Sequence, residues 1–380
     1  MAQQPSKGLA DVVAAATALS DIDGRAGRLS YRGYDISDLA GAATFEEVAY
    51  LLQRGAPPDA GQLSSYRDEM AAGRAVGELV ASDLAAIAHH QEPMEALRTL
   101  VSLASAGDPD KDSNAADANL RKAARLTAQQ PVLVAGYEAA RNGRDVPAAD
   151  PGLSLAGNFL LQVTGVPPSR RAAEILDICL VLHADHTMNA STFAARVCAA
   201  TLSDMHSAVV AALGTLKGPL HGGANEQVML LLEEIAKNAQ ADAVESAGSE
   251  VAARLGRGEK IMGFGHRVYK VEDPRATILR ELAAELARSA GDDTYYQMSR
   301  RIEETVLAEK GLYPNVDFFA ATVYHYLGIP TDLFTPVFSV SRMAGWTAHV
   351  IEQHADNRLI RPDSEYIGEA DLTWVPLAAR

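Results

Sequence analysis

The segment KGPLHGGANE, residues 217–226, sets one histidine among three glycines and a proline, between two long helical patterns. Glycine lets the backbone adopt positive φ and come close to a ligand, and Pro219 cannot continue the preceding helix. After His221 the apolar positions repeat at helical spacing, at Val228, Leu231, Leu232 and Ile235, so free backbone amides of a helix N-terminus face the segment. The pattern predicts a helix–helix connection that carries either a functional histidine or one that merely faces solvent.

Length and composition describe a large, acidic, helix-rich protein. The chain has 380 residues, of which 48% are hydrophobic and 22% charged, enough for two or three domains with a sizeable core. Its formal net charge of −15 disfavours nucleic acid and anionic membranes. An anionic ligand therefore needs a local basic pocket. Cys179 and Cys198 lie in apolar stretches and are expected to be reduced core thiols. Without a signal sequence or a long apolar run, a cytoplasmic location is expected.

Apolar periodicity predicts an almost wholly helical chain. Helices are expected at residues 8–18, 60–74, 83–90, 94–105, 115–142, 191–200 and 205–216. A capping box at Thr44 and Glu47 begins another helix, which ends near Gly55. Residues 21–24 are expected to form a turn, and residues 28–34 one arm of a small β-hairpin, the only strand expected.

A pair of histidines, His183 and His186, follows an apolar helical pattern. Ile175, Cys179, Leu182 and His186 are spaced by four, three and four residues, so the apolar stripe is expected to lead directly to His186. The pair suggests a metal site, but no cysteine or further histidine cluster completes one and the spacing differs from H-E-x-x-H. No metal is expected, and a zinc hydrolase is the weaker interpretation.

A second histidine framed by glycines lies in GFGHRVYK, residues 263–270, with Asp273, Pro274 and Arg275 shortly after it. Basic side chains gather here. Gly263 and Gly265 have the look of a dinucleotide-binding motif, but the full G-x-G-x-x-G pattern and a βαβ unit are missing. A Rossmann site is therefore excluded.

Two further features bear charge within apolar surroundings. Asn315 can cap a helix that carries Asp317 in its first turn, where the helix dipole favours an ionised carboxylate, although helix-start aspartates are common. Arg342 lies inside an otherwise apolar helix, and Arg358 and Arg361 precede a proline. Long arginine side chains often reach water from such positions, so Arg342 alone indicates little.

Together, these residues favour acid–base chemistry on a small polyanion. An arginine fork fits a carboxylate with two hydrogen bonds, so several arginines point to a substrate with more than one carboxylate. A histidine can donate a hydrogen bond to a carbonyl or an enolate, and an aspartate can remove a proton from carbon where water is excluded. Formation of a carbon–carbon bond is therefore plausible.

Three motifs in this order and spacing resemble the citrate synthases: residues 218–226, 263–269 and 314–317. Further blocks extend the resemblance over nearly the whole chain, at residues 28–35, 183–193, 334–346 and 356–362. The resemblance implies an all-α fold of the citrate synthase type, multihelical and two-domain, with a minor N-terminal hairpin. It further implies a large domain of residues 1–221 and 326–380 and a small domain of residues 222–325, whose closure forms the site.

The same resemblance assigns roles to individual residues. His221 would stabilise the enol or enolate formed from an acetyl thioester, Asp317 would remove its methyl proton, and His266 would polarise the oxaloacetate carbonyl. A Claisen-type condensation and thioester hydrolysis would follow. The oxaloacetate-binding positions are His186, Arg275 and Arg342, with Asn189 supporting the binding histidine. The coenzyme A positions are Lys270, Gly263, Gly265 and Asn315.

Resemblance also implies a homodimer in which Arg361 reaches into the active site of the neighbouring subunit. The chain shows no extra N-terminal segment that resembles the one in the NADH-regulated hexameric branch, so the short dimeric type is expected. Coenzyme A thioester is a co-substrate, and no tightly bound cofactor is expected. The alternatives are a 2-methylcitrate synthase that uses propionyl-CoA and, from another class, a non-catalytic helical binding protein. HRVYK at residues 266–270 leans towards citrate synthase.

Overall fold

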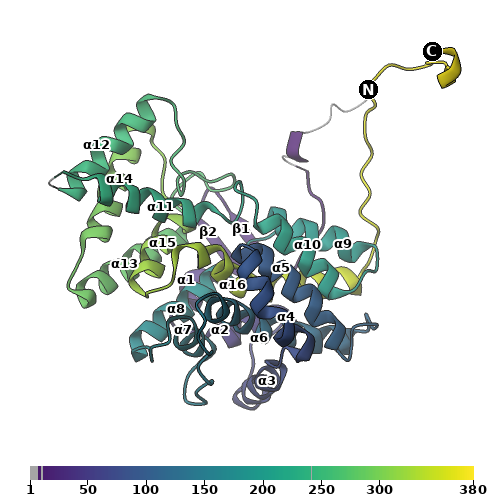
Figure 1. Cartoon of the computed structure of the whole chain (residues 1–380), viewed down its shortest axis with the longest axis horizontal. Coiled ribbons are helices and arrows are strands. Elements are labelled where there is room, and N and C mark those ends of the chain that lie inside the picture. Colours follow the sequence, from purple (N-terminus) through teal and green to yellow (C-terminus); the bar gives the residue numbers. More distant parts are fainter. Residues whose placement is uncertain (1–6, 10–11, 241) are drawn as a thin grey trace.

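The computed structural model describes residues 7–9, 12–240 and 242–380, and these form 16 α-helices and one small sheet (Figure 1). The helices are α1 (Ile36–Leu39), α2 (Phe45–Arg54), α3 (Ala60–Gly73), α4 (Gly77–His90), α5 (Pro93–Ala104), α6 (Ala116–Arg141), α7 (Leu155–Thr164), α8 (Arg170–His183), α9 (Ala190–Ala200), α10 (Met205–Leu216), α11 (Ala224–Asn238), α12 (Ala243–Gly256), α13 (Pro274–Ala290), α14 (Thr294–Lys310), α15 (Val316–Tyr326) and α16 (Phe334–Ala355). The helices predicted between residues 60 and 216 are confirmed, although α4 begins six residues earlier than expected.

The sheet consists of β1 (Ser20–Asp23), β2 (Arg28–Tyr31) and β3 (Tyr34–Asp35), all antiparallel and in this order. β1 pairs with β2 from Ser20 opposite Tyr31 to Asp23 opposite Arg28. The predicted hairpin arm is confirmed at residues 28–31, but residues 32–33 form a turn and Tyr34 begins β3, so the expectation of a single strand is wrong. The predicted turn at residues 21–24 is wrong, because residues 21–23 supply the partner strand that the arm needs for its backbone hydrogen bonds.

The helix predicted over residues 8–18 is also wrong. Only Lys7–Leu9 form a short 3-10 turn, and residues 12–17 have no regular structure. Residues 10 and 11 lie outside the described part of the chain. Val13 is 90% exposed, so its side chain packs against nothing that would hold a helix. Short helices depend on such packing because nucleation is costly.

Helix α16 is the centre of the molecule. Its residues from Phe334 to Val350 are all buried, and it packs against α2, α6, α8, α9 and α10. Gly345 allows α16 to come close to the end of α8, because a Cβ at position 345 would lie 2.3 Å from the Ala184 carbonyl oxygen. The helix therefore approaches the turn after α8 closely enough to bring Arg342 beside it.

Helix α8 ends three residues before His186, so the predicted stripe does not reach that histidine on the helix. The Tyr31 hydroxyl, from β2, lies 2.9 Å from the Asp185 carbonyl oxygen and 3.2 Å from that of Val181. A side chain from the sheet thus occupies the end of α8. His186 lies instead in the turn of residues 184–189, which closes where Asn189 caps α9.

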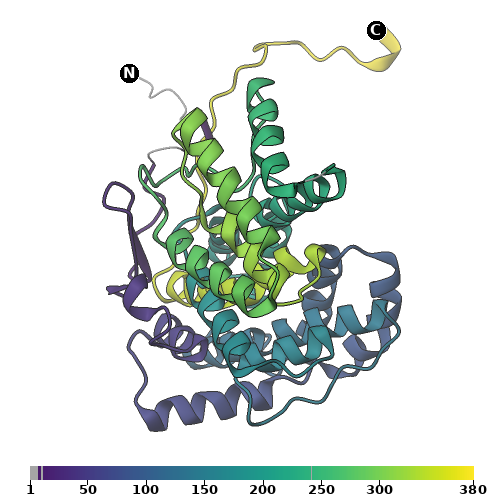
Figure 2. The ribbon, with the colours of Figure 1, turned by 90° about the vertical axis from the view of Figure 1, so that its left-hand side faces the viewer.

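Helices α11 to α15 pack largely on one another, and α12, α13 and α14 project to one side of the molecule (Figures 1 and 2). After α16, residues 357–380 extend away from the helices as a tail that ends in a 3-10 turn, Leu377–Ala379 (Figure 2). None of the helices in the described ranges is long and apolar enough to cross a membrane.

Candidate active site

His221 lies in the turn between α10 and α11. Gly222 makes the turn possible, because a Cβ there would lie 2.5 Å from the Leu216 carbonyl oxygen. The Ser191 backbone N–H donates to His221 Nε2 at 3.2 Å. A backbone amide can only donate, so Nε2 is an acceptor and the ring proton is on Nδ1. Burial, with the positive charge of Arg342, lowers the pKa of His221 to about 4, so the ring is neutral near pH 7.

Ser191 connects His221 to two other helices. Its hydroxyl lies 2.8 Å from His221 Nε2 and 2.8 Å from Asn189 Oδ1, and it accepts from Trp346 Nε1 at 3.1 Å. Asn189 caps α9 by accepting from the Thr192 N–H at 3.1 Å. Its amide also lies 3.4 Å from the His186 carbonyl oxygen. Asn189 therefore contacts both the backbone of His186 and the serine that bonds to His221.

A short pairing of two loops carries His266. Gly265 N–H donates to the Tyr313 carbonyl at 2.9 Å, and Asn315 N–H donates to the Gly263 carbonyl at 2.8 Å. The Asn315 side chain donates to the Gly265 carbonyl at 3.0 Å. Both glycines have positive φ, 83° and 74°, which favours glycine. The pairing fixes the loop of His266 beside the N-terminus of α15.

The ring of His266 is oriented by its own loop. The N–H groups of Val268 and Tyr269 donate to Nδ1 at 3.0 and 3.2 Å, so the proton is on Nε2. Burial, with the charge of Arg275, lowers its pKa to about 4. The His186 ring lies edge-on at 5.2 Å between centroids. Burial and Arg275 hold the pKa of His186 well below its usual range, so both rings are neutral.

Two buried guanidinium groups face the cluster formed by His186, His221 and His266, and their hydrogen-bond partners differ. Arg275 forms a two-point ion pair with Asp273, at 3.0 and 2.7 Å. Although burial opposes ionisation, Arg275 lowers the pKa of Asp273. Arg342 instead donates from Nε to the His183 carbonyl at 2.7 Å and lies over the Phe338 ring. Burial lowers its pKa to about 10.

Arg342 lacks a carboxylate partner within the described ranges, and its Nη1 is buried without a hydrogen bond there. A buried cation is strongly destabilising unless an anion or several acceptors compensate it. An anionic ligand would supply that partner. This buried group is the local positive charge that the acidic composition requires.

Asp317 is in the first turn of α15, and Asn315 caps that helix by accepting from the Asp317 N–H at 3.0 Å. Its Oδ1 is buried, and no group in the described part of the chain bonds to it. Burial raises the pKa of Asp317 to about 7, against the opposing charge of Arg275. A carboxyl group with this pKa can exchange a proton near neutral pH.

Two predicted site residues lie apart from this cluster. Lys270 is exposed on the loop after His266, with Nζ 3.4 Å from the Arg267 carbonyl oxygen. Arg361 is on the extended tail, where it pairs with Asp363 at 3.3 Å and is 75% exposed. It takes no part in this chain's own cluster.

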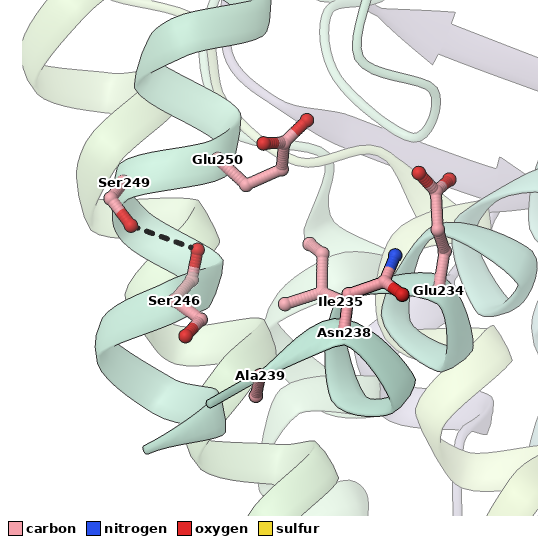
Figure 3. A pocket seen from close by; sticks show the side chains of 7 residues that line it. All are labelled: Glu234, Ile235, Asn238, Ala239, Ser246, Ser249 and Glu250. Carbon is pink, nitrogen blue, oxygen red and sulfur yellow. Dashed lines mark hydrogen bonds between the residues drawn. The ribbon is translucent and has the colours of Figure 1, made fainter. Parts of the chain in front are cut away.

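The described residues hold no group of three or more possible metal ligands. The His183 Nδ1 instead pairs with the Cys179 carbonyl oxygen at 2.8 Å. An open pocket of about 430 Å³ lies between α11 and α12 (Figure 3). None of the predicted site residues lines it, and its carboxylates Glu234 and Glu250 pair with Arg254.

Sequence reasoning missed the groups that hold the site residues in place. Ser191 belongs to no predicted catalytic or binding set, although its N–H fixes the tautomer of His221. Asp273 directly before a proline is a helix-cap signal, and the structure uses it both to cap α13 and to pair Arg275. Tyr31, which ends α8, carries no local signal because its contacts are about 150 residues away.

Comparison with known proteins gives concordant matches. The family model described as citrate synthase, C-terminal domain, matches residues 8–363. A citrate synthase of Haloferax volcanii is 48% identical over 384 residues, covering all of both chains. A 2-methylcitrate synthase of Shewanella oneidensis is 41% identical, covering 98% of this chain and 97% of that protein. The ternary complex of carboxymethyl coenzyme A and oxaloacetate with the Thermoplasma acidophilum citrate synthase superposes with a TM-score of 0.91 at 32% identity, covering 99% and 100% of the two chains.

The raised pKa of Asp317 predicts a pH-dependent cost to stability. The unfolded carboxyl titrates near 3.8 and the folded one near 7, so ionisation is harder in the folded state. The wild-type free energy of unfolding should fall, relative to Asp317→Asn, as pH rises from about 4 to 7, by at most about 4 kcal/mol at roughly 1.36 kcal/mol per pKa unit. Urea unfolding at several pH values measures this. The control is Asp68→Asn, at an exposed position on α3, whose free energy of unfolding should follow the same pH dependence as that of the wild type. Equal pH dependence of the wild type and Asp317→Asn would refute the prediction.

Proposed function

The chain belongs to the citrate synthase family, and we propose that it condenses acetyl-CoA with oxaloacetate and hydrolyses the product to citrate and coenzyme A. The observation that carries this proposal is the arrangement around Arg342: two neutral imidazoles with fixed N–H donors and a carboxyl group whose pKa is near 7. Such a set suits an acyltransferase that forms a carbon–carbon bond through an enolate.

Asp317 is the proposed base. Its unbonded Oδ1 takes a proton from the methyl group of acetyl-CoA, which leaves the electron pair on carbon as an enolate. The Nδ1–H of His221 donates a hydrogen bond to the thioester oxygen, where the negative charge develops. Because Ser191 fixes the tautomer of His221, this donor is present before substrate binds.

Oxaloacetate is the proposed electrophile. Its carboxylates pair with Arg342 and with the free edge of Arg275, whose other edge Asp273 occupies. The Nε2–H of His266 donates to the keto oxygen and polarises the carbonyl, and His186 lines the same space. The enolate carbon bonds to the keto carbon, and the oxygen of that carbonyl accepts a proton. Water then cleaves the thioester, releasing coenzyme A and citrate.

The coenzyme A side of the site is proposed for Gly263, Gly265, Asn315 and Lys270. The first three form the paired loops beside Asp317, so their backbone can approach the ligand closely. Lys270 offers an exposed ammonium group for a phosphate. No resident cofactor is needed for this chemistry.

We further propose a large domain of residues 1–221 and 326–380 and a small domain of residues 222–325. Helices α11 to α14 lie in the second unit and pack mainly with each other and α15, which supports the division. His221 then stands at the junction, and His266 and Asp317 come from the small domain. Closure of the two brings the donors and the base together and excludes water.

A homodimer is proposed as the active unit. Arg361 is exposed and pairs with Asp363 on a tail that carries exposed apolar side chains, among them Tyr366, Ile367, Leu372 and Trp374. Exposed apolar groups of this kind are typical of a segment covered by a partner. Arg361 would then complete the site of the second copy.

The two candidate thioester substrates, acetyl-CoA and propionyl-CoA, differ only in the length of the acyl chain. The similarity to a 2-methylcitrate synthase favours propionyl-CoA as a second candidate thioester. The catalytic residues do not separate the two substrates, because they act on atoms that both share.

Asp317→Ala should lower kcat by at least about 100-fold, because a positioned general base contributes roughly 100- to 10,000-fold. The arginines remain, so the Kd for oxaloacetate should stay near the wild-type value. Thiol release and calorimetric titration measure the two quantities, with Asp68→Ala as the control. Wild-type turnover in Asp317→Ala would refute the mechanism.

A complementation experiment tests the shared site. Arg361→Leu and Asp317→Ala, each inactive alone, are co-expressed with different tags, and the mixed dimer is isolated through both tags. One of its two sites combines an intact Asp317 with an intact Arg361 from the other chain, so about half of the wild-type activity per dimer is expected. If Arg361 serves its own chain, the mixed dimer stays inactive.

The ratio of kcat/KM for acetyl-CoA to that for propionyl-CoA should exceed about 10, since one methylene in an apolar pocket changes discrimination by roughly 10- to 200-fold. Steady-state thiol release with oxaloacetate and each thioester measures it. A ratio below one would identify the chain as a 2-methylcitrate synthase instead.

A further inference from the structure

The turn between β1 and β2, residues 24–27, lies directly against the loop that follows His266. The Gly24 carbonyl accepts from the Lys270 N–H at 2.8 Å. A Cβ at Gly24 would lie 2.3 Å from the Val268 carbonyl oxygen and 2.9 Å from its carbon. Gly27 also comes close to this loop, since a Cβ there would lie 2.9 Å from Val271 Cγ2, but its φ of 64° by itself favours glycine. The backbones of the two segments are in contact without side chains between them.

The contact explains why residue 24 is glycine. Gly24 is not among the glycines with positive φ, so position 24 does not need glycine for its own backbone conformation. Only the approach of the Val268 carbonyl excludes a side chain. The glycine is therefore a feature of the contact with the loop and not of the hairpin.

The turn is held rigidly on its own side. The Asp23 carboxylate accepts from the N–H groups of Arg25 and Ala26 at 3.0 and 2.9 Å. Asp23 lies opposite Arg28 in the antiparallel register of β1 and β2, at the end next to the turn. An open hollow of about 470 Å³ remains beside the contact, lined in part by Arg25 and Lys270, so the turn touches the loop at a few defined atoms.

The atoms that the turn holds are the neighbours of those that orient His266. The N–H groups of Val268 and Tyr269 donate to His266 Nδ1. The Val268 carbonyl belongs to the same peptide as the Tyr269 N–H, and it is this carbonyl that lies against Gly24. The Lys270 N–H, one peptide further, bonds to the Gly24 carbonyl. Moving either contact would turn the N–H groups away from Nδ1.

We propose that Gly24 is a positioning residue for His266: by admitting the Val268 carbonyl and binding the Lys270 N–H, the hairpin turn fixes the ring so that its Nε2–H points at the substrate carbonyl. The inference rests on the proposed role of His266 in polarising oxaloacetate. Since the turn and the loop come from the two proposed domains, the contact forms only when these are close together.

The test compares Gly24→Ala with Gly256→Ala, a control at a glycine without positive φ and with open space around its Cβ position. The infrared carbonyl band of enzyme-bound oxaloacetate reports polarisation directly. In Gly24→Ala the band should return towards its position in water and kcat should fall by about 10- to 100-fold, as for a displacement of a catalytic group by about 1 Å. The Kd for oxaloacetate and the thermal unfolding midpoint should stay near those of the control.

A wild-type band position and kcat in folded Gly24→Ala would overturn the inference. If that variant does not fold, Asp23→Ala loosens the turn without adding bulk and should shift the band in the same direction, and an unshifted band would overturn the inference equally. A wild-type enzyme that binds oxaloacetate without shifting its carbonyl band would refute the proposed role of His266 itself. The two failures are therefore distinguishable.

Discussion

Backbone amides decide the chemistry of the candidate site, because they determine which nitrogen of each imidazole carries the proton. The Ser191 N–H points at His221 Nε2, and the N–H groups of Val268 and Tyr269 point at His266 Nδ1. An amide can only donate, so each ring is left with one donor on its opposite side. Burial keeps both rings neutral. The site thus holds hydrogen-bond donors of fixed direction without adding positive charge.

Much of the surrounding structure serves to hold those amides in place. Asn189 caps α9 so that Ser191 faces His221, and the paired loops at residues 263–265 and 313–315 hold the start of the His266 loop. The central helix α16 contributes Trp346, whose Nε1–H donates to the Ser191 hydroxyl, and Arg342, whose Nε–H donates to the His183 carbonyl. A protein built in this way places its site with backbone geometry, and the side chains supply the reacting atoms.

The sequence predicted what depends on local rules. Helical periodicity, the capping box at Thr44 and the cap at Asn315 need only a few neighbouring residues, and each is found where expected. The motifs around His221, His266 and Asp317 identified the family because their order along the chain is specific. The helix over residues 8–18 and the stripe to His186 were wrong, because both depend on what packs against them. Tyr31 and Gly24 act through contacts with segments far away in the chain, which no local pattern displays.

Arg342, which has no carboxylate partner among the described residues, affects how long the folded molecule survives. Without an anion in the site, the protein carries the desolvation cost of a buried cation, and the attraction of a bound anion offsets that cost. A ligand that binds only the folded state raises the free energy of unfolding with its concentration. The supply of the dicarboxylate would then govern the survival of the chain in the cell as well as its turnover. An enzyme short of substrate would be the form most readily removed by proteolysis.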